Sequence, residues 1–221
     1  LPVIVGGTGL WMDALLRGHG FAKGSAGGAV RRELETRFEQ EGIEPLLAEL
    51  RQVDPDSAVR LHPADTKRIL RALEVYRETG QTITAHNAAT QAMPDRYSAV
   101  KIGLRFADRE DMKALIDRRV DKMAAEGLLT EVRALLDRGL PKNATAMQAI
   151  GYKEAVAAVR GEAMAQEAAD AIRLASRQYA KRQLTWLRRD AQLFWLRHEK
   201  TPDMDLACRR STQFLAGRGI E

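Results

Sequence analysis

The stretch Leu1-Pro2-Val3-Ile4-Val5-Gly6-Gly7-Thr8-Gly9 decides which fold class we expect for this chain. The five apolar residues at its start are typical of a buried strand. The glycines that follow permit a tight turn, and the pattern of residues 10–16 predicts a helix directly after it. A buried parallel strand needs neighbours on both sides, so we expect the sequence to be the C-terminal portion of a longer protein.

The next part of the chain has helical patterns only. Residues 18–28 are rich in glycine and lack an apolar period, which indicates a loop and a domain boundary. Apolar residues at helical spacing then predict three helices, near residues 30–38, 43–50 and 65–79. We expect Asp65 to be the N-cap of the third helix and Gly80 to end it. Residues 22–96 are therefore predicted to form a helical insertion subdomain.

The second half of the sequence returns to strands. Alternating apolar residues over 100–106 predict a half-buried strand, and residues 193–196 predict a last short one. The remaining elements are predicted helices near 112–123, 132–136, 153–189 (two helices) and 201–221, with a loop over 139–150. Strands separated by helices predict an α/β fold whose parallel-sheet core comprises residues 1–21 and 97–221.

Composition narrows the protein class. With 221 residues, of which 45% are hydrophobic, the chain can bury a sizeable core. Cys208 is its single cysteine, which excludes an internal disulfide and a cysteine metal site. The sequence has no apolar stretch of membrane-spanning length and no signal peptide, so we expect a cytoplasmic protein without a membrane partner. The histidines lack metal-ligand spacing, and no metal ligand is predicted in this chain: His19, His62, His86 and His198.

Positive charge is concentrated near the C-terminus, although the net charge of the chain is only +5. From Ile172 to Arg189 there are six basic residues and no acidic one. As a helix, this segment separates an apolar side from a cationic side. The apolar side has Ile172, Tyr179, Trp186 and Leu187, and the cationic stripe has Arg173, Arg177, Lys181 and Arg188, with Arg182 and Arg189 beside it. We therefore expect an anionic partner, such as a polyphosphate or a nucleic-acid backbone.

The turn Gly6-Gly7-Thr8-Gly9 is a candidate anion site, because backbone N–H groups at a helix N-terminus attract negative charge. The hydroxyl of Thr8 is suited to contact a phosphate or a magnesium-bound water. The alternative is an ordinary turn in which Thr8 is the N-cap of the following helix. The turn is not a P-loop, and no P-loop motif occurs in the sequence.

Two helical segments carry further candidate cations. Lys67 and Arg71 lie one turn apart, with Arg68 next to them, which suits a grip on a backbone phosphate. The alternative is a solvated face in which Arg71 pairs with Glu74. Arg119 lies near the edge of an apolar stripe, so we expect it to be partly buried and to bind a carboxylate or a phosphate, a structural ion pair being the alternative.

The junction Met147-Gln148-Ala149-Ile150-Gly151-Tyr152-Lys153 combines an amide, an aromatic ring and a cation around a glycine. These residue types suit the reading of a single-stranded base by stacking and by hydrogen bonds to its edge. The alternative is a helix start at which Tyr152 packs inward.

Taken in order, these segments resemble the bacterial tRNA dimethylallyltransferase family, also called isopentenyl-tRNA transferases. The resemblance spans nearly all of residues 1–200. The matching pieces are residues 2–10, 54–55, 65–75, 118–123 with 127–128, 149–154 and 181–188. Each piece is weak alone, and the ordered set is specific.

The resemblance implies a P-loop-kinase-like α/β core, incomplete here, with a helical insertion. It implies transfer of a dimethylallyl group from dimethylallyl diphosphate to the exocyclic amine of the adenosine 3′ of the anticodon. The implied partner is the tRNA anticodon stem-loop, bound by a monomer, with Mg2+ helping to hold the diphosphate. The adenosine would be flipped out into a channel, as chemistry on a stacked base requires.

The resemblance also assigns roles to residues. Thr8 matches the catalytic threonine near the reacting amine, and Arg119 matches a diphosphate-side or structural arginine. The positions that match tRNA-contacting segments are Arg31; Lys67, Arg68, Ile69, Leu70 and Arg71; Gln148, Ala149, Ile150, Gly151, Tyr152 and Lys153; and Lys181, Arg182, Gln183, Leu184, Thr185, Trp186, Leu187 and Arg188.

The sequence departs from the family pattern in two ways. Trp11 stands where a tyrosine is usual, so the ring is kept. The P-loop and the general-base aspartate of the family lie upstream of Leu1, so we expect the 221 residues alone not to catalyse transfer. Two other functions stay open, a non-catalytic RNA-binding fragment and a prenyltransferase of free adenine nucleotides. The extended basic surface argues against the second, because a free nucleotide would not need it.

Overall fold

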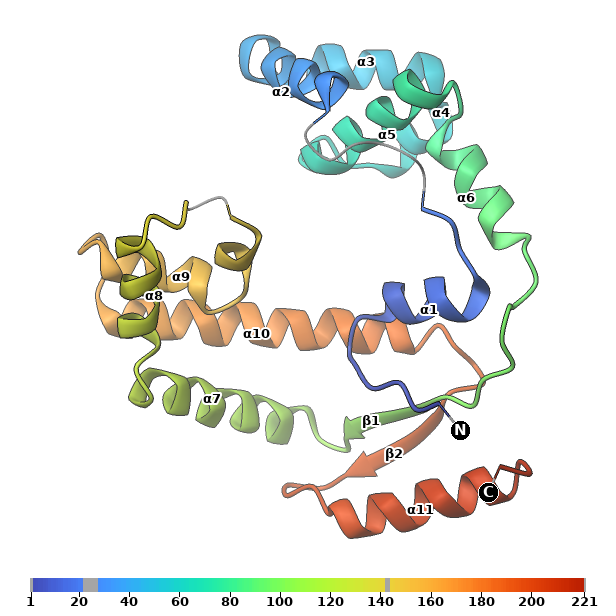
Figure 1. Ribbon diagram of the computed structural model, residues 1–221, viewed down its shortest axis with the longest axis vertical. Helices are drawn as coiled ribbons and strands as arrows, with labels where there is room; N and C mark the ends of the chain where they lie inside the picture. Colours follow the sequence, from blue (N-terminus) through green and yellow to red (C-terminus); the bar gives the residue numbers. More distant parts are fainter. Residues whose placement is uncertain (1, 22–27, 142–143, 221) are drawn as a thin grey trace. The chain divides into compact units, whose positions relative to one another are not determined.

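The computed structural model describes residues 2–21, 28–141 and 144–220. The chain divides into two compact units, one formed by Leu10–Ala99 and the other by Leu1–Gly9 together with Val100–Glu221 (Figure 1). Part of the predicted glycine-rich loop, residues 22–27, and part of the predicted loop 139–150, residues 142–143, lie outside the described residues. Among the described helices, none combines the length and the apolar content that a membrane crossing requires.

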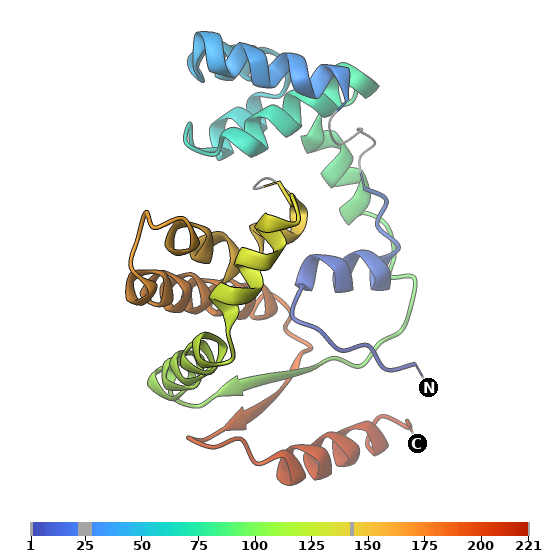
Figure 2. The ribbon, with the colours of Figure 1, turned by 60° about the vertical axis from the view of Figure 1, so that its left-hand side comes forward.

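In the described part of the unit formed by Leu10–Ala99, all regular elements are helices. Its helices are α1 (Gly9–Arg17), α2 (Ala29–Glu41), α3 (Glu44–Val53), α4 (Pro55–Arg60), α5 (Thr66–Thr79) and α6 (Ile83–Gln91). In Figure 2, α2 and α3 lie against α5 and form a small bundle. The three helices expected from apolar spacing are thus present, and α4 and α6 are additional elements.

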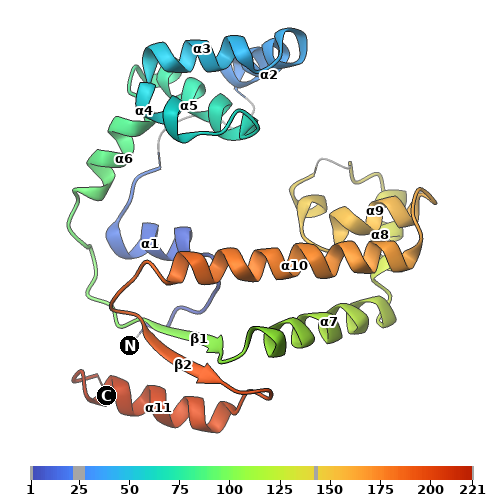
Figure 3. The ribbon, with the colours of Figure 1, turned by 180° about the vertical axis from the view of Figure 1, so that it is seen from behind.

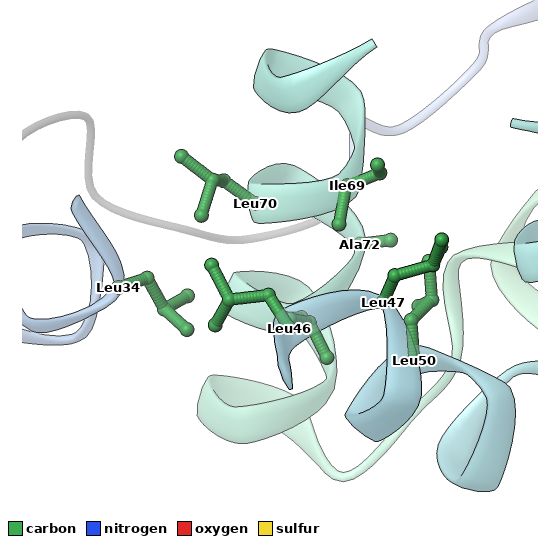
Figure 4. Close-up of a cluster of buried hydrophobic side chains, with 8 residues drawn as sticks. Leu34, Leu46, Leu47, Leu50, Ile69, Leu70 and Ala72 are labelled. Atoms are coloured by element: carbon green, nitrogen blue, oxygen red, sulfur yellow. The ribbon is translucent and has the colours of Figure 1, made fainter. Parts of the chain in front are cut away.

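Leucine and isoleucine side chains at helical spacing make the core of this bundle. Figure 4 shows Leu34 of α2 pointing toward Leu46 of α3, with Ile69 and Leu70 supplied by α5. Leu34, Leu46 and Ile69 are fully buried. Each such side chain contributes roughly 1.5–3 kcal/mol on burial, which offsets part of the entropy lost on ordering the helices.

Both predicted terminal residues of α5 lie at its ends. Gly80 adopts the left-handed conformation (φ +70°), and its N–H donates to the carbonyl of Tyr76, as expected for a helix stop. Asp65 occupies the N-cap position, but its side chain makes no capping hydrogen bond. Its carboxylate instead lies 3.5 Å from the guanidinium of Arg68. The predicted N-cap position of Asp65 is therefore confirmed, with its side chain next to Arg68 and not bonded to the backbone of the first turn.

The second unit holds a small parallel sheet. Strands β1 (Ile102–Phe106) and β2 (Phe194–His198) pair with Leu104 opposite Leu196. The helices of this unit are α7 (Arg109–Ala125), α8 (Leu128–Asp137), α9 (Tyr152–Val159), α10 (Ala165–Leu187) and α11 (Met204–Ala216), with a short 3-10 helix η1 (Thr145–Gln148). Figure 3 shows α7 running alongside the long α10, and α11 next to β2. Parallel strands joined through helices confirm the predicted α/β class.

The strand predicted at residues 1–5 is absent from the described residues 2–5. These residues have no regular structure, and Val5 is 91% exposed. A strand is held by backbone hydrogen bonds to a neighbour, and in the described part of the chain β1 and β2 pair only with each other. The apolar composition of this segment therefore does not suffice to make it a strand.

A second core lies where α7, α8, α9 and α10 meet. Its fully buried side chains include Val132 of α8, Met147 of η1 and Ala155 of α9. Gly151 begins α9 with φ +105°, a conformation that other residues rarely adopt, and its N–H donates to the carboxylate of Glu154 at 2.8 Å. This core holds α9 against α10 and thereby fixes the junction between η1 and α9.

Candidate functional site

The loop of residues 6–9 lies directly against α10. The side-chain Nε2 of Gln183 donates a hydrogen bond to the carbonyl oxygen of Gly7 at 2.9 Å. A Cβ atom added to Gly7 would lie 2.0 Å from that nitrogen, and a Cβ added to Gly9 would lie 2.1 Å from Cδ1 of Trp186. Neither glycine has a positive φ. The glycines are therefore needed for close approach to the helix, and not for the turn conformation that the sequence suggested.

Thr8 is the residue between these two contacts. It is exposed, and α1 begins at the next residue. The structure thus brings the predicted catalytic residue next to two of the predicted tRNA-binding residues, Gln183 and Trp186.

The basic segment of α10 consists of two different halves. In the first half, Arg173 pairs with Asp170 and with Asp121 of α7, and Arg177 makes a two-pronged pair with Asp117 of α7. The hydrogen bond to Asp121 is the main cause that raises the pKa of Arg173 above its usual value. These two arginines join α7 to α10, so the expectation of an uninterrupted cationic stripe was wrong.

The second half of the segment, at the end of α10, keeps its charge. Lys181, Arg182, Arg188 and Arg189 are exposed, and no ion pair is found for them among the residues that the structure describes. Arg182 lies over the ring of Tyr179 at 5.8 Å, and Arg189 lies over the ring of Trp186 at 5.1 Å. We call these four residues the terminal cation cluster. Cations are also favoured there by the negative end of the helix dipole.

The other predicted tRNA contacts on this helix are uncharged, and most of them are partly buried. Leu184 and Leu187 are partly buried, and the hydroxyl of Thr185 donates to the backbone carbonyl of Lys181 at 2.9 Å. Gln183 and Trp186 are occupied by the loop. Of residues 181–188, the side chains that point charge toward solvent are therefore Lys181, Arg182 and Arg188.

The predicted tRNA-binding residues at the junction of η1 and α9 also divide into exposed residues and residues that pack inward. Gln148, Ala149 and Lys153 are exposed, whereas Ile150 and Tyr152 pack against the second core. The Tyr152 hydroxyl donates to the carboxylate of Glu131, a bond that raises the pKa of the phenol above its usual value. The inward-packed ring, which was the alternative interpretation, describes Tyr152 in this structure.

The remaining predicted residues lie mainly in the helical unit. Arg71 pairs with the buried carboxylate of Glu74 at 2.9 Å, as the alternative interpretation expected. Ile69 and Leu70 belong to the bundle core, so their side chains are not offered to a ligand. Lys67 and Arg68 are exposed.

Arg31 and Arg119 differ in their surroundings. Arg31 pairs with Glu35 at 2.7 Å on the same helix. Arg119 is exposed, so the expectation of partial burial was wrong. The buried residue at this point of α7 is its neighbour Val120, and one residue along a helix turns the side chain by about 100°.

Two structurally important carboxylates were missed from sequence. Asp117 and Asp121 are four residues apart on α7, the same spacing as Arg177 and Arg173 on α10. Matching i, i+4 charges of opposite sign on two helices were the available signal, although nothing local showed that the helices are neighbours.

Comparisons with known proteins show the family to which the chain belongs. Residues 1–190 match the family model described as IPP transferase. The chain belongs to the IPP transferase family. The match covers the loop, the helical unit and all of α10, and ends before β2.

Individual members of the family give the same result. The chain is 43% identical over 198 residues to the tRNA dimethylallyltransferase of Geobacter metallireducens, covering 89% of this chain and 63% of that protein. It is 46% identical over 196 residues to the one of Symbiobacterium thermophilum, covering 89% and 60%. The crystal structure of the tRNA isopentenylpyrophosphate transferase from Bacillus halodurans is 34% identical, with a TM-score of 0.59 over 95% of this chain and 64% of that one. The chain thus spans about three fifths of the length of these relatives.

Proposed function

We propose that this protein transfers a dimethylallyl group from dimethylallyl diphosphate to the exocyclic amine of the adenosine 3′ of the anticodon in tRNA. The observation that carries the proposal is the loop with Thr8, which is held on the same helix end that presents the terminal cation cluster. Its support comes from family membership and from relatives named tRNA dimethylallyltransferase. A cytoplasmic location belongs to the same proposal.

The proposed reaction forms a bond between the amine nitrogen and the allylic carbon while the bond from that carbon to the diphosphate oxygen breaks. The diphosphate leaves with the bonding electrons, and the amine loses a proton to a base. Within this chain, the Thr8 hydroxyl would orient the amine. The terminal cation cluster would hold phosphates of the RNA backbone near the loop, which sets register without reading sequence.

The described residues do not supply a metal site. No group of three or more His, Cys, Asp or Glu side chains that could hold a metal ion is found in the described part of the chain. The described residues therefore do not provide a set of ligands for the Mg2+ that the resemblance implies. The proposed role of this chain is to bind tRNA and to position the acceptor amine.

A transfer assay tests the proposal with two acceptors. The protein, purified from its full natural reading frame, would be incubated with dimethylallyl diphosphate, MgCl2 and either an unmodified tRNA transcript with adenosine 3′ of the anticodon or AMP. The 221 residues alone, which contain no P-loop motif, are expected to give no product in the same assay. We expect modified adenosine in the tRNA, at that position only, and none in AMP. A tRNA that differs solely by guanosine at that position is the control. Equal modification of AMP would overturn the tRNA specificity, and modification of neither would remove the proposed activity.

A further inference from the structure

Two residues of the predicted tRNA-binding segment contact the protein's own loop. Gln183 hydrogen-bonds the carbonyl of Gly7, and the ring of Trp186 lies where a Cβ on Gly9 would be. Residues 183 and 186 are three apart, so they share a face of α10. That face is turned toward the loop, so the Nε2 of Gln183 and the Trp186 ring are already in contact with the protein itself.

The two contacts of the loop with α10 lie on either side of Thr8. Gly7 and Gly9 are two apart and both approach α10, while Thr8 between them is exposed. With Gly7 and Gly9 both against α10, the residue between them remains open to solvent. A Cβ at Gly9 would overlap the Trp186 ring, whereas a Cβ at Gly7 would displace the end of the Gln183 side chain and so break its hydrogen bond to the loop.

Trp186 also belongs to the cationic end of the helix. The guanidinium of Arg189 lies 5.1 Å from its ring centroid, within the range of a cation–π interaction. The Trp186 ring thus contacts both the loop and Arg189, a member of the terminal cation cluster. The helix end therefore fixes the distance between Thr8 and a cation available for RNA phosphate.

We propose that Gln183 and Trp186 are positioning residues, which clamp the loop of residues 6–9 on α10 and so place the Thr8 hydroxyl relative to the terminal cation cluster. Neither residue contacts the RNA. This inference rests on the proposed function, because the position of Thr8 matters only if its hydroxyl meets the acceptor amine. Misplacement of a reacting group by about 1 Å is enough to cost roughly a hundredfold in rate.

The first test substitutes Gln183 and measures three quantities. Gln183→Ala removes the bond to Gly7, and Gln183→Glu keeps the size but loses the donor. We expect both to lower kcat by roughly tenfold to a hundredfold with the KM for tRNA and its salt dependence unchanged. Cleavage within residues 6–9 by a non-specific protease, under conditions of limited proteolysis, should become faster in both, because the loop is no longer held on α10. Gln178→Ala, at an exposed glutamine on the same helix, is the matched control and should change none of these.

The second test exchanges volume between the loop and the helix. Gly9→Ala alone should lower kcat, because its Cβ would overlap the Trp186 ring. In the Gly9→Ala/Trp186→Ala double variant, the overlap is gone, so its kcat should be no lower than that of Trp186→Ala alone. If Gly9 and Trp186 acted independently, the fold reduction in kcat of the double variant would be the product of the two single reductions. That result would contradict the clamp.

The outcomes separate this inference from the proposed function. An inactive native protein would remove the activity, yet limited proteolysis would still show whether Gln183 holds the loop. An active protein in which Gln183→Ala raises the KM for tRNA and leaves the cleavage rate within residues 6–9 unchanged would overturn the inference, since Gln183 would then contact RNA. Melting temperatures of all variants within about 3 °C of the native protein are required for a valid comparison.

Discussion

At the scale of single residues, the side-chain oxygens of Asp54 and Thr8 have different roles. Asp54 is buried, and its carboxylate accepts from the N–H of Ser57 at 3.2 Å and from the hydroxyl and N–H of Thr84 at 2.6 and 3.1 Å. It thereby caps α4 and ties it to α6, so its role is structural. Thr8 is exposed, and its proposed role is chemical.

Asp54→Ala is expected to destabilise the helical unit by roughly 3 kcal/mol, because it removes a cap and leaves several donors unsatisfied. The measurement is urea unfolding followed by circular dichroism. Asp56→Ala, at an exposed neighbour, is the control and should change stability by less than about 0.5 kcal/mol. Equal effects of the two substitutions would contradict the assigned role.

The same carboxylate gives a pH dependence. Burial alone would raise the pKa of Asp54, but the hydrogen bonds from Thr84 and Ser57 outweigh it and hold the pKa below its usual value. The stabilisation is therefore present above the unfolded-state pKa of about 3.9 and is lost as the pH falls through the lower folded-state pKa. Acid unfolding of the native protein should thus show a steeper loss of stability below about pH 4 than that of Asp54→Asn. Superimposable profiles would rule out this linkage.

Thr8→Ala should lower kcat for prenyl transfer by about a hundredfold while tRNA affinity changes little, since the hydroxyl is proposed to act on the amine and not on the RNA backbone. Thr8→Ser, which keeps the hydroxyl, should retain most of the activity. Steady-state kinetics with tRNA as the varied substrate distinguish an effect on kcat from an effect on tRNA affinity. A loss of tRNA affinity that matches the loss of kcat would assign Thr8 to RNA binding.

At the scale of secondary-structure elements, α10 has two functions along its length. Its first half is joined to α7 by the pairs of Arg173 with Asp121 and of Arg177 with Asp117. Its second half supports the loop and ends in the terminal cation cluster. The helix therefore connects the packing of the second unit to the proposed RNA-binding surface.

Removal of positive charge is expected to have different effects in the two halves of α10. Lys181→Ala with Arg182→Ala should weaken tRNA binding and make the slope of log K against log salt shallower by roughly 1 for each phosphate that is no longer neutralised. Arg177→Ala should leave that slope unchanged and lower stability by up to about 1 kcal/mol. Fluorescence anisotropy with labelled tRNA over a range of KCl concentrations gives the slopes. A shallower slope in Arg177→Ala would place the first half in the interface.

At the scale of the whole molecule, each unit has a hydrophobic core of its own. Leu73 is fully buried in the core of the helical unit, and Met147 is buried in the core formed by α7, η1 and their neighbours. Two separate cores allow the two units to open independently, because local stability follows local burial.

Leu73→Ala is expected to cost about 2–5 kcal/mol and to accelerate deep hydrogen exchange in α2, α3 and α5 only. Met147→Ala should cost a similar amount and accelerate exchange in α7–α10 only. Native-state exchange followed by mass spectrometry resolves the two sets of peptides. Faster exchange across both units after either substitution would indicate a single cooperative unit.

The sequence by itself determined the elements whose signal is local. Helical spacing located α5, α7 and α10, alternation located β1, and Gly80 ended its helix, because periodicity and backbone freedom act over a few residues. α6 was missed, since it lacks an apolar stripe and is held instead by Asp54 through Thr84. Charge clustering located the end of α10 as a candidate site.

Only the tertiary structure decided how that site is divided. Gln183 and Gly7 are far apart in sequence, as are Arg177 and Asp117, so no local pattern shows that they meet. The neutralised arginines, the clamped loop and the irregular conformation of residues 2–5 all depend on which distant segments lie nearby. Hydrogen bonds and ion pairs act over a few ångströms in space, and folding alone decides which residues come within that reach.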